Sequence, residues 1–140
     1  MLLNNHSYYS LRYGTFSEKE LLRLAQEAGY TSLALTDINN TSACLNFIRL
    51  APQYGIKPIV GIDFRNGAQQ LYVGIAQSNQ GFQALNGFLS HHSHHKKKLP
   101  ELAPELENVV FIYPFEQLLL IEKTTLKPYE YVGVNLRDFK

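Results

Sequence analysis

The apolar residues of this chain follow two spacings, one helical and one extended. After Ser17, leucine and alanine recur three and four positions apart until Gly29, and Glu20 stands where a capping box requires it. This pattern predicts a helix over residues 17–29. Short apolar runs bounded by polar residues and glycine predict strands. They lie at residues 2–5, 32–36, 59–62, 70–76, 109–113 and 131–134.

Two further helices are expected between these strands. The first is capped by Asn40 or Thr41 and ends at Pro52 and Gly55. Its buried face holds Cys44, Phe47, Ile48 and Ala51. The second runs from about Asn79 to Ser90 and packs through Phe82, Leu85, Phe88 and Leu89. Asn66-Gly67 has the composition of a tight hairpin turn, and a leucine-rich segment fills residues 115–120.

The order strand, helix, strand, helix, strand in the first half predicts parallel pairing through right-handed crossovers. The fold class is therefore α/β. No internal repeat and no linker interrupts the chain, so residues 1–140 are expected to form one domain.

Charge and composition exclude several kinds of partner. The formal net charge is +1, and a domain that grips DNA by itself usually carries a basic surplus, so DNA is expected to be contacted only indirectly. The chain holds no apolar run long enough to cross a membrane. Cys44 is the only cysteine, which rules out an internal disulfide and suits the reducing cytoplasm.

Polar residues at the carboxyl ends of the expected strands are the candidate site. Four places qualify: His6 with Asn4, then Asp37, then Asp63, and the loop after Tyr113. Two carboxylates and an imidazole that converge could hold a divalent metal ion. The simpler interpretation is that Asp37 is a helix cap or turn former and that His6 is a hydrogen-bonded structural residue. Without a second histidine, the metal signal is weak.

Residues 91–98 (HHSHHKKK) are the strongest local bias in composition. Histidine-rich tracts can chelate metals, and basic runs can contact phosphates. This run follows the end of an expected helix, where cations meet the negative end of the helix dipole, and it precedes Leu99-Pro100. We therefore expect a solvated basic loop over His91 to Lys98 rather than a dedicated site.

Three segments of the chain together resemble the PHP (polymerase and histidinol phosphatase) domain that begins bacterial DNA polymerase III α subunits. They are residues 6–14 (HSYYSLRYG), 34–40 (ALTDINN) and 55–63 (GIKPIVGID), similar to HSxYSLLDG, ALTDHGN and GIKPIIGxE in the family. The resemblance is strong over residues 2–65 and looser over 71–89. It implies a distorted, TIM-like PHP-type (β/α) barrel. The six expected strands are fewer than a full PHP barrel contains, which leaves its closure open.

Departures from the family pattern fall on its metal ligands. The family places ligands on a His-x-His pair, on the aspartate before glycine, on the histidine after Thr-Asp and on the glutamate that closes the third segment. The positions that have lost their ligand are Asn4, Tyr13 and Ile38, and Asp63 replaces the glutamate with a shorter reach. The vestigial site is His6, Asp37 and Asp63. We expect no catalytic residue, no intact metal site and no cofactor.

The resemblance implies that residues 1–140 are an N-terminal fragment of a DNA-directed DNA polymerase, a nucleotidyltransferase of DNA replication. The fragment would act as a scaffold for the rest of the polymerase chain and would dock a proofreading exonuclease subunit. Two alternatives stay open. One is a surviving metal-dependent phosphoesterase or 3′–5′ exonuclease, and only this alternative calls for a divalent metal. The other is a free-standing PHP-like protein.

Overall fold

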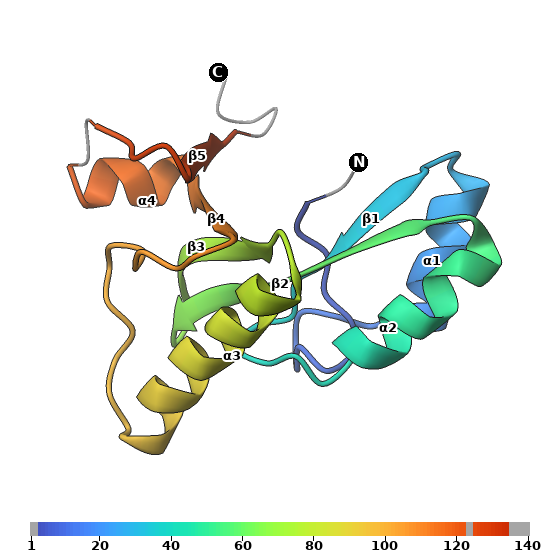
Figure 1. The fold of residues 1–140 in the computed structure, drawn as a ribbon, viewed down its shortest axis with the longest axis horizontal. Helices are drawn as coiled ribbons and strands as arrows, with labels where there is room; N and C mark the ends of the chain where they lie inside the picture. Colours follow the sequence, from blue (N-terminus) through green and yellow to red (C-terminus); the bar gives the residue numbers. More distant parts are fainter. Residues whose placement is uncertain (1–2, 123–124, 135–140) are drawn as a thin grey trace. The chain divides into compact units, whose positions relative to one another are not determined.

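The computed structural model describes residues 3–122 and 125–134, which form a mixed α/β fold (Figure 1). The elements in chain order are α1 (Glu18–Glu27), β1 (Ser32–Leu35), α2 (Cys44–Leu50), the 3-10 helix η1 (Ala51–Tyr54), β2 (Lys57–Asn66), β3 (Gln69–Ala76), α3 (Asn79–His94), β4 (Val109–Pro114), α4 (Phe115–Leu120) and β5 (Glu130–Gly133). The five strands are hydrogen-bonded in the order β1-β2-β3-β4-β5. The chain divides after Ile62 into two compact units.

Helix α1 of the first unit begins with the predicted capping box. The Ser17 hydroxyl accepts a hydrogen bond from the Glu20 amide at 3.3 Å, and the Glu20 carboxylate accepts one from the Ser17 amide at 3.0 Å. These bonds satisfy two backbone donors that a helix start otherwise leaves open. After Ala28, Gly29 adopts a φ of 76°, which favours glycine and ends the helix.

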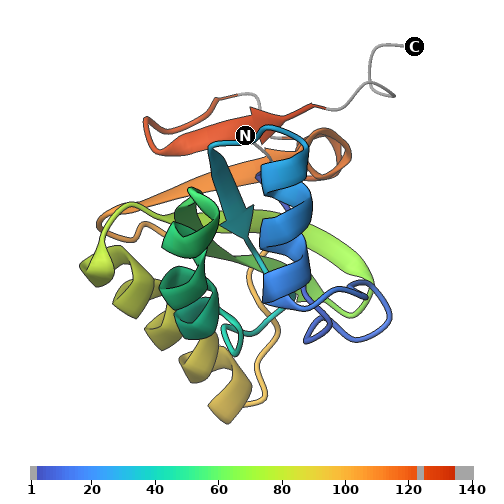
Figure 2. The same cartoon turned by 90° about the vertical axis from the view of Figure 1, so that its right-hand side faces the viewer.

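The first unit has its own hydrophobic core between two helices and a parallel strand pair. Strand β1 pairs in parallel with the start of β2, with Ser32 opposite Lys57 and Leu35 opposite Val60, as predicted. Helices α1 and α2 pack against each other beside β1 (Figures 1 and 2). The buried cluster consists of Leu22, Ala25, Leu33, Leu35, Ala43, Phe47, Ala51 and Ile56.

Three details of the first unit differ from the predictions. Residues 3–5 form no strand, and Leu2, where the predicted strand begins, lies outside the described residues. Side chains take part in the hydrogen bonds that a strand would make through its backbone alone: the Asn5 backbone amide donates to the Thr36 hydroxyl, and the Asn5 side chain donates to the Ala34 carbonyl. Helix α2 has no side-chain cap, since Asn40 instead accepts a hydrogen bond from the Ser42 amide in the preceding turn. Ile48 is 39% exposed and lies outside the core.

Cys44 lies in the first unit on the buried face of α2, as predicted. Burial, and to a smaller degree the nearby charge of Asp37, raise the pKa of its thiol to about 12. The thiol therefore stays protonated and unreactive at neutral pH.

The second unit is built on a hairpin. Only Gly67 and Ala68 separate β2 from β3, a connection short enough to require antiparallel pairing. Strand β3 is antiparallel to β4, and β4 is parallel to β5. Helix α3 packs on β3 and β4. The core between them is aromatic and contains Phe64, Tyr72, Phe88, Phe111 and Tyr113 in successive ring contacts.

Helix α3 is longer than predicted, so the first part of the expected loop over His91 to Lys98 is helical. Ser78 caps its start through a hydrogen bond from the Gly81 amide. The helix ends at His94 and His95 is its C-cap residue, whereas Lys96 to Lys98 follow outside the helix and are exposed, as predicted. The 3.6-residue period does not break at Ser90, because histidine and serine are tolerated in a helix that is already formed. Of the helices among residues 3–122 and 125–134, none combines the length and apolarity that a bilayer crossing demands.

Candidate functional site

Asp37 follows β1 directly, and its side chain is completely buried. Its carboxylate accepts three short hydrogen bonds from the loop that precedes α1. The Ser7 amide donates to Oδ1 at 2.7 Å, the Ser7 hydroxyl to Oδ2 at 2.6 Å and the Ser10 hydroxyl to Oδ1 at 2.6 Å. A buried carboxylate requires such donors, because it has lost its water. Both oxygens of Asp37 are thus engaged in holding the loop.

The loop bound to Asp37 is closed by its own backbone. The Ser10 amide donates to the Ser7 carbonyl, and the Gly14 amide donates to the Ser10 carbonyl, each at 2.9 Å. A Cβ atom at Gly14 would lie 1.8 Å from the Ser7 carbonyl oxygen, so only glycine fits there. The loop that carries the first family-like segment is therefore a compact structure anchored on the end of β1.

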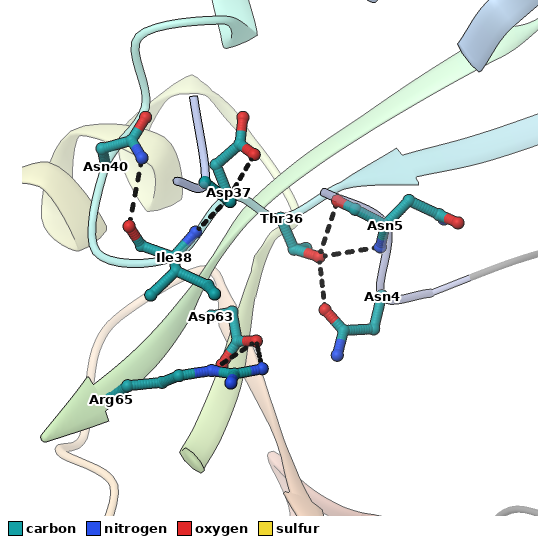
Figure 3. A network of polar contacts seen from close by, with 9 residues as sticks. Asn4, Asn5, Thr36, Asp37, Ile38, Asn40, Asp63 and Arg65 are labelled. Carbon is teal, nitrogen blue, oxygen red and sulfur yellow. Dashed lines mark hydrogen bonds and ion pairs between the residues drawn. The ribbon is translucent and has the colours of Figure 1, made fainter. Parts of the chain in front are cut away.

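Asn4 occupies the first of the lost-ligand positions and belongs to a second polar cluster. The Thr36 hydroxyl donates to the Asn4 side-chain oxygen at 2.9 Å and accepts a hydrogen bond from the Asn5 amide at 3.2 Å (Figure 3). The Asn5 side chain donates to the Ala34 carbonyl at 3.0 Å. These contacts attach the N-terminal segment to β1, so the asparagines serve local structure.

Ile38 and Tyr13 stand at the other two lost-ligand positions. Ile38 is half-buried; its amide donates to the Ser10 hydroxyl at 2.9 Å, and its carbonyl accepts from the Asn40 side chain at 3.0 Å (Figure 3). Its hydrocarbon side chain offers no electron pair to a metal. Tyr13 is 52% exposed, and its ring meets His6 edge-on with the ring centroids 6.5 Å apart.

Asp63 lies on β2 and belongs to the second unit. Its buried carboxylate pairs with Arg65, two residues further along the strand and therefore on the same face. Arg65 donates from Nη2 at 2.8 Å and from Nε at 3.1 Å to Asp63 Oδ2 (Figure 3). The Arg65 side chain is 11% exposed. A guanidinium charge thus lies against the buried carboxylate.

The fourth candidate place, the loop after Tyr113, is absent because α4 begins directly after Pro114. Tyr113 points into the core of the second unit, where its hydroxyl donates to Glu130 at 3.0 Å and accepts from the Ala103 amide at 2.7 Å. Burial is the main cause that raises the pKa of Tyr113, to about 12. This phenol has a structural role.

A divalent metal, which the PHP fold implies, does not fit these residues. The oxygens of Asp37 are engaged by Ser7 and Ser10, and the carboxylate of Asp63 is neutralised by Arg65. Within residues 3–122 and 125–134, no three histidine, cysteine, aspartate or glutamate side chains gather as a metal site would need. We therefore derive no chemical step through a metal ion.

The residues that sequence reasoning missed are the partners of the two aspartates. Ser7 and Ser10 stand three residues apart in a polar turn, a spacing that only the folded loop brings to one carboxylate. Arg65 could have been found, because a strand with period two places it on the same face as Asp63. A basic residue two positions after the aspartate at the end of a predicted strand was the signal that indicated this ion pair.

A match to a protein-family model gives the class of this protein. The PHP domain family model matches residues 3–125, and the chain belongs to this family. The resemblance found in the three sequence segments is thereby confirmed, and so is the mixed α/β fold of a partial, distorted barrel.

Within the PHP family, the chain is similar in sequence to one kind of curated protein. The chain is similar to DNA polymerase III subunit alpha from Ureaplasma parvum, at 34% identity over 83 residues, which are 59% of this chain and 8% of that protein. It is similar to the same subunit from Bacillus subtilis at 36% over 89 residues and from Escherichia coli at 33% over 94 residues. These alignments cover 59% and 63% of this chain and 8% of each relative. The chain thus spans a small part of their length.

Solved structures with a similar fold are more distant in sequence. An amidohydrolase from Chromobacterium violaceum superposes with a TM-score of 0.53 at 23% identity, over 68% of this chain and 34% of that chain. A putative metal-dependent phosphoesterase from Bifidobacterium adolescentis gives a TM-score of 0.51 at 12% identity, over 66% of this chain and 33% of its own. At these identities the likeness concerns the fold alone.

Proposed function

We propose that this chain is a non-catalytic PHP module of a replicative DNA polymerase alpha subunit, with a scaffold and partner-docking role. The observation that carries the proposal is the state of the two aspartates: Asp37 holds the Ser7 to Gly14 loop, and Asp63 holds Arg65. In both places a structural contact uses the carboxylate that hydrolytic chemistry would need.

The alpha subunits that the chain resembles suggest the protein in which this module works. The alpha subunits it resembles supply the expectation that the parent protein is a nucleotidyltransferase that copies DNA in the cytoplasm. In that setting this module braces the remainder of the polymerase chain and offers a surface to a proofreading exonuclease subunit. With a formal net charge of +1, it leaves the phosphate contacts to other parts of the polymerase.

An activity assay tests the non-catalytic part of the proposal. The full chain, free of tags, is incubated with Mn²⁺ or Zn²⁺ and a primer–template duplex, and release of nucleotides from the primer end is measured. We expect no release above the level of His6→Ala. Metal-dependent release that His6→Ala abolishes would instead establish the alternative, a residual phosphoesterase or 3′–5′ exonuclease.

A binding assay tests the docking part. The chain is titrated with the proofreading exonuclease subunit of the same organism, and separately with duplex DNA at low salt. We expect saturable binding of the protein and negligible binding of DNA. Tight, salt-dependent binding of DNA by the chain alone would contradict the proposal.

A gene-level observation separates the polymerase module from a free-standing PHP-like protein. We expect the reading frame to continue past Lys140 into the acidic catalytic domain of a polymerase. A stop codon at that point in the native gene would favour the free-standing protein.

A further inference from the structure

Four histidines lie at the C-terminal end of helix α3, the yellow end of that helix at the lower left in Figure 1. His91, His94 and His95 are exposed, whereas His92 is half-buried and packs on the Phe88 ring with the ring centroids 4.4 Å apart. The helical repeat places residues four apart on one face in adjacent turns. His91 and His95 therefore form a pair on the solvent face of the helix.

The two rings of this pair are close and tilted against each other. Their centroids are 4.5 Å apart, and the planes are inclined by 37°. Two imidazoles at this spacing on one helical face can hold the same ion, as the i, i+4 histidines of helical zinc sites do. His94 lies edge-on to His95, with an interplanar angle of 82°, and as its chain neighbour it faces another direction.

The orientation of the His95 ring is fixed by the backbone. Its Nδ1 lies 2.8 Å from the His91 carbonyl oxygen. A carbonyl oxygen only accepts, so Nδ1 carries the proton and the lone pair of the neutral ring is on Nε2. A hydrogen bond of this kind is what orients a metal-binding histidine and selects its ligating nitrogen.

The end of helix α3 has one favourable and one unfavourable electrostatic effect on a bound cation. The carbonyls at the helix C-terminus present the negative end of the helix dipole to a cation. Lys97 opposes a bound cation, so the two metal–nitrogen bonds must outweigh its repulsion.

We propose that His91 and His95 form a two-ligand surface site for a borderline divalent transition-metal ion such as Zn²⁺, bound through both Nε2 atoms. Imidazole nitrogen suits ions of this class, whereas Mg²⁺ and Ca²⁺ prefer oxygen ligands. Because no third histidine, cysteine or carboxylate among the described residues completes the site, water fills the remaining positions. The site is separate from the vestigial positions His6, Asp37 and Asp63, and it does not depend on the proposed function.

A titration of Zn²⁺ into the full chain, purified without a polyhistidine tag, tests this proposal. We expect one saturable site, and we expect His91→Ala and His95→Ala each to weaken it by about 10-fold or more. Matched controls are His94→Ala, on the same helical turn, and His6→Ala, at the old pocket; both should keep the wild-type affinity. Mg²⁺ should not bind at the same concentrations.

A second measurement reports where the ion sits. Zn²⁺ bridging adjacent turns should slow amide hydrogen exchange at residues 91–97 and shift the Nε2 resonances of both rings, while leaving exchange in the first unit unchanged. The proposal is overturned if His94→Ala weakens binding as much as His91→Ala does, if the double variant His91→Ala/His95→Ala binds like wild type, or if no binding occurs.

Discussion

At the scale of single residues, the two buried aspartates each hold a neighbouring part of the chain in place. Asp37 joins the end of β1 to a loop thirty positions earlier in the chain through three hydrogen bonds to one carboxylate. Bonds to a charged acceptor are stronger than neutral ones and costly to remove, because the donors remain buried. The loop geometry thus depends on Asp37.

Asp37→Ala should therefore lower the free energy of unfolding by about 3 kcal/mol, since it leaves buried donors on Ser7 and Ser10 without an acceptor. Urea denaturation at neutral pH measures the change. Glu27→Ala is the control: this acid pairs with Arg23, and both side chains are more than half exposed. The control should cost about 0.5 kcal/mol or less. Equal losses in the two variants would mean that Asp37 does not anchor the loop.

Arg65→Met should also be destabilising, by about 3 kcal/mol, because it leaves the Asp63 charge buried opposite a hydrocarbon. The double variant Asp63→Leu/Arg65→Met removes both charges and should regain most of that loss. Urea midpoints of the two single variants and the double variant form a mutant cycle. Additive effects in this cycle would show that the two side chains do not act as a pair.

Tyr113 gives the protein a dependence on alkaline pH. Its pKa is raised, chiefly by burial, to about 12, whereas the pKa of a tyrosine in the unfolded chain is about 10. Between these values unfolding releases a proton, so stability falls as the pH rises through this window. We expect the urea midpoint to drop between about pH 10 and about pH 12, and Tyr113→Phe to show a smaller drop. An undiminished drop in the variant would assign the effect to other groups.

At the scale of helices and strands, local signals predicted much of the fold. The capping box of α1, the β1–β2 crossover and the hairpin after Asn66 are encoded by neighbouring residues and were found. The missing cap of α2 and the continuation of α3 past Ser90 were not, because they depend on tertiary contacts and on a helix already formed. The partners of Asp37 also come from folding, since the loop must close before both serines face it.

Two glycines of helix α3 offer a matched test of packing at this scale. A Cβ at Gly81 would lie 2.0 Å from the Asn108 carbonyl oxygen, whereas one at Gly87 would meet nothing within 4 Å. Gly81→Ala should therefore destabilise the protein by about 1–3 kcal/mol through overpacking. Gly87→Ala should stabilise it by about 0.5–1 kcal/mol through helix propensity. Thermal unfolding of both variants measures the contrast, and the same sign in both would refute this packing argument.

At the scale of the whole molecule, each unit has a core of its own, one mainly aliphatic around α1, α2 and β1 and the other aromatic around β3 and β4. The sequence predicted the family, because the family is legible in three short segments. It did not predict the partners of the two buried aspartates, because Ser10 and Arg65 meet them only in the folded chain.

We accordingly expect the fold to be independent of metal. Exhaustive dialysis against EDTA should leave the urea midpoint unchanged, because both oxygens of Asp37 and Oδ2 of Asp63 are held by protein donors. The measurement is best made on His91→Ala/His95→Ala as well as on wild type, so that an ion on the α3 histidines cannot affect the result. A lower midpoint after EDTA in the double variant would reveal a structural ion elsewhere.

The buried thiol of Cys44 has one more consequence. As the only sulfhydryl in the chain, fully shielded and protonated at neutral pH, it can meet an alkylating or aromatic disulfide reagent only when the first unit opens. The rate of its modification therefore measures how often the first unit unfolds locally. The other half carries no cysteine, so the reagent reports the opening of the first unit alone.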